Sequence, residues 1–61
     1  MLITDKPKNI DNYVEVSEEI SVFLHFNGFT PRYRYNGLYY FKRTNELIDF
    51  MIDKNMIERR M

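Results

Sequence analysis

The clearest pattern along the chain is a pair of strand-like runs that meet at Asn36 and Gly37. Residues 29–35 and 38–43 are dominated by aromatic side chains with arginines between them. The dipeptide Asn-Gly favours a two-residue type I′ turn, because both central positions of that turn need a positive φ. The chain therefore predicts a β-hairpin over residues 29–43.

The two-residue turn also fixes which side chains of the hairpin share a face. Tyr33 is expected opposite Tyr40 and Arg34 opposite Tyr39, and directly opposed side chains lie on the same face of a sheet. One face then carries Phe29, Tyr33, Tyr35, Leu38 and Tyr40, and the other carries Arg32, Arg34, Tyr39, Phe41 and Arg43. We expect the first face to pack on the core. The second, called the basic-aromatic face below, is expected to lie outside it.

A short strand and a helix are predicted before the hairpin. Residues 13–16 have the alternation of a strand. Ser17 follows as the N-cap of a helix over 18–27, with two glutamates in the first turn, where the helix dipole favours acidic side chains. Gly28 is expected to end the helix in the left-handed conformation.

This first helix is apolar over more than half of its circumference. The face expected to meet the sheet consists of Ile20, Phe23 and Leu24. Val22 and Phe26 form a second apolar ridge beside it, and only a narrow polar strip of Glu18, Ser21 and His25 is left. Because one side of a small sheet cannot cover the whole apolar surface, we expect Val22 and Phe26 to form a dimer interface.

A second helix is predicted over 45–54, with Thr44 as its N-cap and Asn55 after its end. Its buried face is expected to consist of Leu47, Ile48, Met51 and Ile52. The resulting order is β-α-β-β-α, an α+β fold in which both helices pack on one face of a small antiparallel sheet. We expect residues 1–11 to be a flexible lead-in, residues 12–55 to be the domain, and residues 56–61 to be a tail or a short strand.

A chain of 61 residues supports one small hydrophobic core. A domain of this size buries only about 60% of the surface of its unfolded chain. The sequence has no cysteine, so neither disulfides nor the usual structural zinc sites can stabilise it. The five Phe and five Tyr side chains and self-association are the remaining sources of stability, and we expect a homodimer.

The charge is balanced, with nine basic and nine acidic residues, and predicts no overall attraction to nucleic acids or anionic membranes. The sequence shows neither a signal peptide nor an apolar run of membrane-spanning length, and we expect a cytoplasmic protein. Ser21 and His25, four positions apart on a helix, lack the pocket and the orienting third group that a catalytic pair needs. We therefore expect no enzymatic activity and no cofactor.

Two groups of charged side chains are candidates for binding. Glu46, Asp49 and Asp53 form an acidic stripe on the second helix, which is expected to be a solvated face or a docking stripe for a basic partner, rather than a metal site. The basic-aromatic face has three interpretations, taken in this order: structural cover of the sheet or a dimer contact, binding of another protein, and binding of a nucleic acid through stacking and phosphate contacts.

Residues 31–51 resemble the wing and the following helix of excisionase/MerR-type winged-helix proteins. The matching positions are Tyr33, Arg34, Asn36, Gly37, Tyr40, Phe41, Lys42, Arg43, Leu47 and Phe50. This resemblance implies nucleic-acid binding through the hairpin. Those proteins carry two helices before the wing, the second of which reads the major groove, whereas only one helix is predicted here.

Residues 14–54 are also similar to very short uncharacterised proteins of phages and mobile elements in low-GC bacteria. The matching positions are Ile20, Leu24, Gly28, Phe29, Tyr40, Phe41, Leu47 and Met51. This resemblance implies a phage protein that binds a host protein stoichiometrically. We therefore expect a non-enzymatic protein-binding module that inhibits a host or bacterial-defence protein in the manner of anti-CRISPR proteins. A small nucleic-acid-binding protein is the alternative.

Overall fold

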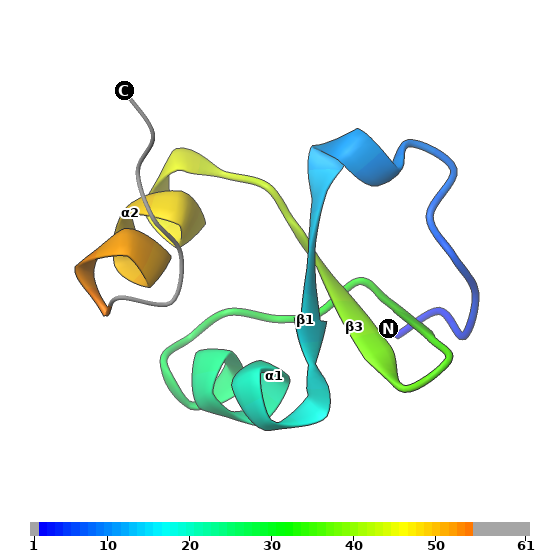
Figure 1. Ribbon diagram of the computed structural model, residues 1–61, viewed down its shortest axis with the longest axis horizontal. Helices are drawn as coiled ribbons and strands as arrows, with labels where there is room; N and C mark the ends of the chain where they lie inside the picture. The colour runs from blue at the N-terminus through cyan, green and yellow to red at the C-terminus, as the bar shows by residue number, and fades with distance from the viewer. Residues whose placement is uncertain (1, 55–61) are drawn as a thin grey trace.

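The computed structural model describes residues 2–54 of the chain. Along the chain these form a 3₁₀ turn, η1 (Ile10–Asn12), followed by β1 (Tyr13–Ser17), α1 (Glu18–Phe26), β2 (Tyr33–Tyr35), β3 (Leu38–Lys42) and α2 (Asn45–Asp53) (Figure 1). The three strands form one antiparallel sheet. The predicted α+β class and the predicted order of elements are thus confirmed. The predicted helix end at Asn55 and the tail 56–61 lie outside the described residues.

The β2–β3 hairpin has the register that its Asn-Gly turn predicts. Tyr33 lies opposite Tyr40, and Asn36 and Gly37 have φ angles of 52° and 77°. Both angles are positive, as a type I′ turn requires. The strand β2 is shorter than predicted. The Arg32 N–H donates to the carbonyl of Tyr40, the residue already paired with Tyr33, so the regular ladder is interrupted at Arg32.

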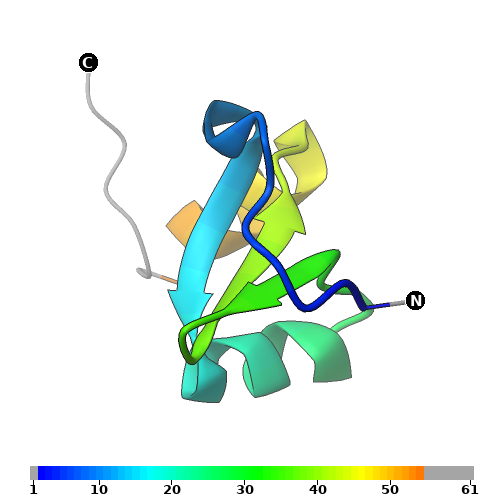
Figure 2. The ribbon, with the colours of Figure 1, turned by 90° about the vertical axis from the view of Figure 1, so that its right-hand side faces the viewer.

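The central strand of the sheet is β3, with β1 on one side and β2 on the other. Val14 pairs with Phe41 and Val16 with Tyr39, so these side chains share one face. The buried core cluster consists of Val14, Val16, Leu24, Phe41, Leu47 and Met51. Because this cluster joins the face of the two valines to side chains of both helices, α1 and α2 cover the same face of the sheet (Figure 2).

The helices cover the face opposite to the one expected from the hairpin alone. Tyr39 and Phe41 of the basic-aromatic face belong to the core side, and Phe41 is only 1% exposed. The reason is the strand β1, whose Val14 and Val16 point to the Phe41 side while Glu15 points to the other side. A face that gains two valines removes more apolar surface from water than a face that gains a carboxylate.

The ends of α1 are those predicted. The Ser17 hydroxyl accepts a hydrogen bond from the backbone N–H three residues later, at 3.5 Å. Gly28 has a φ of 93°. The N–H groups of Gly28 and Phe29 donate to the carbonyls of His25 and Leu24, at 3.1 and 3.0 Å, and close a Schellman motif. The chain is thereby turned out of the helix and back toward the sheet.

The face that α1 presents to the sheet differs from the predicted one. Ser21 and Leu24 are buried, at 5% and 0% exposure, whereas Phe23 is 42% exposed. The prediction that Ser21 lies in an exposed polar strip is therefore wrong. Its small side chain occupies little room between helix and sheet, whereas the Phe23 ring lies at the border and packs on Phe50 of α2, with 5.8 Å between the ring centroids.

The two N-caps give a first testable prediction. The Thr44 hydroxyl accepts from the Leu47 N–H at 3.1 Å, whereas the corresponding Ser17 contact measures 3.5 Å. We expect Thr44→Ala to lower the free energy of unfolding by about 1 kcal/mol. Ser17→Ala should lower it by less, because longer hydrogen bonds are weaker. Urea denaturation measures both losses. An equal or larger loss for Ser17→Ala would contradict the prediction that Thr44 is the stronger N-cap.

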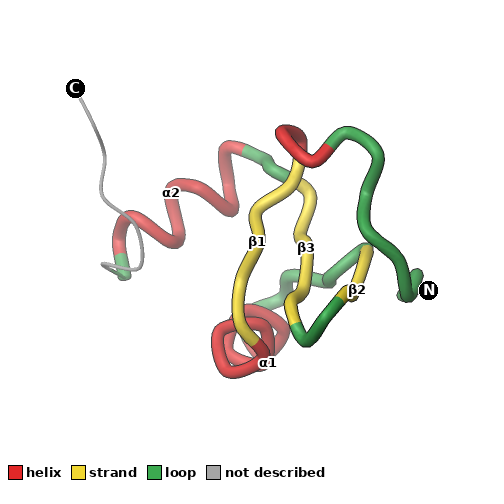
Figure 3. The backbone as a smooth tube through the Cα atoms, turned by 45° about the vertical axis from the view of Figure 1, so that its right-hand side comes forward, coloured by secondary structure: helices red, strands yellow, loops and turns green. Residues whose placement is uncertain are grey.

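The segment before η1 runs beside β2, on the side of the sheet away from α2 (Figure 3). Ile3 forms a parallel bridge with Tyr33: its N–H donates to the Arg32 carbonyl at 3.0 Å, and its carbonyl accepts from the Arg34 N–H at 2.8 Å. Pro7 is buried. This segment therefore covers the outer edge of β2. The predicted division into a flexible lead-in and a domain that starts at residue 12 stays a prediction.

Candidate functional site

The basic-aromatic face does not form one exposed surface. Phe41 lies in the core and Tyr39 is half-buried. Arg43 lies at the end of the sheet, where its Nε and Nη2 donate to the carbonyls of Asp11 and Tyr13 at 3.1 and 3.4 Å. These bonds attach the end of β3 to η1 and to the start of β1, so the Arg43 guanidinium is engaged within the chain.

The two remaining arginines of that face occupy different surroundings. The Arg34 guanidinium carbon lies 5.9 Å from the centre of the Tyr39 ring. A cation–π contact of this kind at an exposed site contributes about 0.5–1 kcal/mol. Arg34 and Tyr39 thus have the geometry of cross-strand cover, one of the three interpretations of this face. Arg32 instead borders a hollow in the surface.

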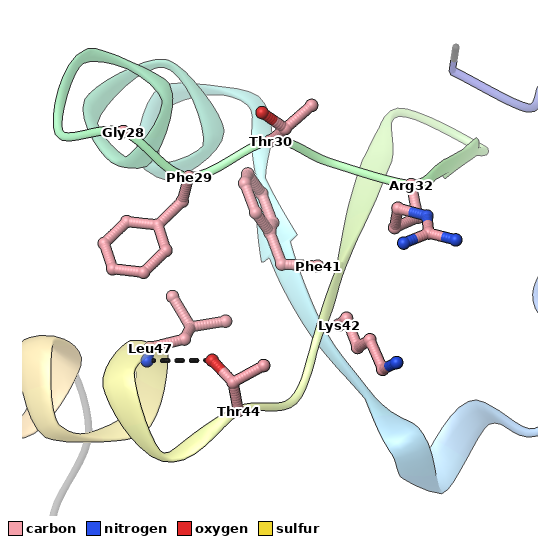
Figure 4. Close-up of a pocket in the computed structure, with 8 residues that line it drawn as sticks. All are labelled: Gly28, Phe29, Thr30, Arg32, Phe41, Lys42, Thr44 and Leu47. Carbon is pink, nitrogen blue, oxygen red and sulfur yellow. Dashed lines mark hydrogen bonds between the residues drawn. The ribbon is translucent and has the colours of Figure 1, made fainter.

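This hollow, of about 230 Å³, lies between the loop after α1 and the junction of β3 with α2 (Figure 4). It is lined by Gly28, Phe29, Thr30, Arg32, Phe41, Lys42, Thr44 and Leu47. Two of the predicted partner-binding residues, Arg32 and Phe41, are therefore brought together here. Arg32 is exposed, whereas Phe41 is buried and can only form part of the wall of the hollow.

The hollow combines an apolar wall with two cations. Phe29, Phe41 and Leu47 lie on one side of it, and Arg32 and Lys42 on the other (Figure 4). Lys42 was missing from the predicted sites, because a lysine at the end of a strand is usually a solvated side chain. The hairpin pattern does not distinguish Lys42 from other exposed lysines. Its place in the hollow becomes clear only from the structure, in which the loop that carries Arg32 also lines the hollow.

A second surface lies on the outer side of α1. Val22 is 50% exposed and Phe26 is 83% exposed, and together they are called the α1 ridge below. Isolated exposed apolar side chains are ordinary on protein surfaces, whereas contiguous ones mark interaction sites. Phe23 extends the α1 ridge toward α2. The prediction that Val22 and Phe26 form a dimer interface requires this exposure and stays a prediction.

The acidic stripe lies on the outer side of α2. Glu46, Asp49 and Asp53 are all exposed. Within residues 2–54, no group of three or more His, Cys, Asp or Glu side chains has an arrangement that could hold a metal ion. The use of the stripe as a docking surface for a basic partner stays a prediction.

The face of the sheet away from the helices holds a tyrosine cluster. The rings of Tyr13 and Tyr33 meet edge to face, 5.2 Å apart. Tyr40 is 2% exposed, and its hydroxyl donates to Glu15 Oε2 at 2.8 Å. This hydrogen bond, followed by burial, raises the pKa of Tyr40 above its ordinary value. The charge of the neighbouring Tyr13, followed by a hydrogen bond with it, raises the pKa of Tyr33.

The bond between Tyr40 and Glu15 predicts a loss of stability at alkaline pH. Because the pKa of Tyr40 is raised in the folded state, its contribution is complete below the unfolded value of about 10 and is lost as pH rises through the folded pKa. We expect the free energy of unfolding to fall above about pH 10 in the wild type, and less steeply in Tyr40→Phe. The remaining slope reflects groups common to both proteins, Tyr33 among them. Urea denaturation across this range measures both slopes, and identical slopes would contradict the assignment.

Ser21 and His25, four positions apart on α1, differ in their exposure to solvent. Ser21 is buried against the sheet, whereas His25 is exposed. The Ser21 hydroxyl therefore lies in the protein interior, and the His25 ring lies at the surface.

Within the described part of the chain, neither helix is both long and apolar enough to cross a membrane.

Comparisons with protein families, with curated proteins and with solved structures find no match for this chain. The interpretation of its surfaces therefore depends on their own residues and geometry. The resemblances to short phage proteins and to the wing of winged-helix proteins stay predictions.

Proposed function

We propose that this chain is a non-enzymatic protein-binding module that forms a homodimer through the α1 ridge. The observation that carries the proposal is the 83% exposure of Phe26, one helical turn from the half-exposed Val22. Complete burial of a phenylalanine side chain contributes about 1.5–3 kcal/mol. A contact between two copies would gain this contribution twice.

The small core also favours self-association. Among the residues that the structure describes, seven core side chains and Pro7 are the buried apolar ones. Domains of about 60 residues bury too little surface to be far from the limit of independent stability, and many gain the remainder from oligomerisation. A second copy placed on the α1 ridge would add buried apolar area to a chain that has neither cysteines nor a metal cluster in its described part.

A two-fold contact suits the dimensions of α1. The helix has nine residues and is therefore about 13 Å long. If the two-fold axis passes between Val22 and Phe26, each Phe26 contacts the Val22 of the other copy, as an isologous interface requires. A standard interface covers about 800 Å² on each partner, roughly a sixth of the 4989 Å² surface of this chain. Polar side chains around the α1 ridge, such as Glu19 and His25, would supply the rim.

Sedimentation velocity over a range of concentrations tests the dimer. We expect the wild-type chain to dimerise reversibly in the micromolar range. Phe26→Ser should weaken the dimer by at least about a hundredfold, because the lost apolar burial counts twice in each dimer. The matched control is Tyr35→Ser, which removes a 42% exposed aromatic side chain from the hairpin and should leave the dimer unchanged.

Two results would overturn the proposed dimer. A wild-type chain that stays monomeric at the highest concentration it tolerates in solution would show that the α1 ridge does not self-associate. A dimer equally stable in the wild type and in Phe26→Ser would show that another surface forms it.

The finer proposal is that a phage encodes the protein and that it inhibits a host or bacterial-defence protein by stoichiometric binding. Its size, the lack of a catalytic set in its sequence and the resemblance of residues 14–54 to short phage proteins support this. Expression of the chain in a defended bacterial strain should raise the plaque count of a phage that the defence system blocks. Unchanged plaque counts across strains that carry each major class of defence system would contradict it.

Binding of a nucleic acid has less support than binding of a protein. Base stacking needs exposed aromatic rings beside phosphate-binding cations, and the aromatic side chains of the basic-aromatic face, Tyr39 and Phe41, belong to the core side of the sheet.

A further inference from the structure

We propose that the hollow beside the β3–α2 junction binds a carboxylate that adjoins an apolar side chain, presented by a partner protein. This inference deepens the proposed function and rests on it, because it assumes that the chain acts by binding protein. It assigns the partner contact to a place separate from the α1 ridge. A dimer would thus present two such hollows.

The wall of the hollow is preformed. Phe41 and Leu47 are each 1% exposed and belong to the core cluster. The ring of Phe29 packs on the ring of Phe50, with 5.2 Å between the ring centroids. An apolar group that enters the hollow therefore meets side chains already fixed by packing, and little conformational entropy is lost on binding.

The two cations beside this wall are available to an anion. Arg32 and Lys42 are both exposed, and within residues 2–54 neither makes an ion pair. Arg43, by contrast, is occupied by backbone carbonyls. Guanidinium and ammonium groups form their strongest hydrogen bonds with carboxylate or phosphate oxygens. The hollow thus joins an apolar surface to an anion-binding rim.

The size of the hollow and the charge around it favour a carboxylate from a protein. At about 230 Å³ it is smaller than the roughly 300–1,000 Å³ of pockets that enclose whole small molecules, so it suits one side chain. Nucleic-acid sites track a backbone with many cations, whereas two cations lie here and the chain is neutral overall. The carboxylate could come from an Asp or Glu beside an apolar residue, or from a C-terminal apolar residue.

NMR titration of the full chain with short peptides tests the inference. The probes are acetyl-Gly-Gly-Leu with a free carboxylate, acetyl-Gly-Leu-Asp-Gly-amide, and the forms of each in which an amide replaces the carboxylate. We expect the backbone amides of Thr30, Arg32 and Lys42 to shift with the carboxylate probes, at a Kd of about 1 mM. The amide forms should bind at least about fivefold more weakly. The two carboxylate probes distinguish an internal acid from a chain terminus.

Charge-removing variants locate the binding. Arg32→Gln and Lys42→Gln should each weaken the carboxylate probes by about three- to fivefold, as expected for charge pairs at an exposed site. Arg34→Gln removes the same charge from a residue that does not line the hollow and is the matched control, with no change expected. Equal weakening by Arg34→Gln and Arg32→Gln would overturn the inference, because it would reveal a general charge effect.

The titration also separates this inference from the proposed dimer. Phe26→Ser should bind the carboxylate probes as the wild type does, even where sedimentation shows it to be monomeric. If the probes leave the hollow unshifted while the wild type dimerises, the inference fails and the dimer stands. If a single-stranded oligonucleotide shifts the same amides and the carboxylate probes do not, the site belongs to nucleic acid and the inference is overturned.

Discussion

Phe41→Ala is expected to leave the chain largely unfolded at 25 °C. Phe41 is 1% exposed and belongs to the core cluster in which β1, β3 and both helices meet. Truncation of a buried phenylalanine to alanine costs about 3–5 kcal/mol. A folded chain of this length is stable by about 3–9 kcal/mol, so the loss removes most or all of that stability. Circular dichroism and thermal unfolding measure it.

The matched control for this prediction is Phe26→Ala. It removes the same side chain from a position that is 83% exposed. At concentrations where the monomer dominates, we expect the free energy of unfolding to change by less than about 0.5 kcal/mol. The pair of variants tests the placement of the core directly, because the hairpin pattern alone placed Phe41 on the outer face. A folded Phe41→Ala chain with an unchanged melting temperature would contradict the structure.

Removal of residues 1–8 is expected to destabilise the chain by about 3 kcal/mol. Ile3 makes two backbone hydrogen bonds with the outer edge of β2, and each contributes about 1 kcal/mol. Pro7 is buried, and Tyr40 is 2% exposed although it points away from the helices. We therefore expect the loss of the segment to expose apolar surface as well.

Urea denaturation of the truncated and the full chain measures this effect as a lower midpoint. Ile3→Pro provides a second variant without truncation, because it removes the N–H that donates to the Arg32 carbonyl and should cost about 1 kcal/mol. Lys8→Ala changes an exposed side chain of the same segment and serves as the control. If the segment were a flexible lead-in, all three changes would leave the midpoint where it is.

Local signals predicted much of this fold. The Asn36-Gly37 turn fixed the hairpin register, and Ser17, Gly28 and Thr44 marked helix ends within one or two residues. Each of these features depends on a few neighbouring residues: a positive φ, a side-chain oxygen three positions before a free N–H, or a left-handed C′ residue. They can therefore be read without knowledge of the strand order.

The face of the hairpin that meets the core could not be read in this way. Both faces carry aromatic side chains, and the choice depends on which strand lies beside β3. The decisive residues, Val14 and Val16, are more than twenty positions away from their partners in β3. Their alternation with Glu15 showed one apolar side of β1 but not the side of the hairpin to which it belongs. The bridge between Ile3 and Tyr33 is also long-range, so the local pattern of the N-terminal residues does not show it.

In the candidate site, too, some residues could be predicted from local sequence signals and others depend on long-range contacts. Arg32 was found from its charge and its place in the hairpin, whereas Lys42 lines the hollow only because the loop after α1 meets the β3–α2 junction there. Arg43 looked like Arg32 in the sequence but reaches the carbonyl of Asp11, a contact that depends on the placement of η1. Val22 and Phe26 are both exposed, as a ridge beside the sheet-facing side of the helix requires, and their use as a dimer interface stays a prediction.

In the proposed homodimer, two copies of the chain meet through the α1 ridge. An isotope-filtered NOE experiment on an equal mixture of labelled and unlabelled chains tests it most directly. We expect cross-peaks between the Phe26 ring of one copy and the Val22 methyl groups of the other. A dimer without any intermolecular cross-peak from α1, or a sample with no intermolecular cross-peaks at all, would contradict the claim.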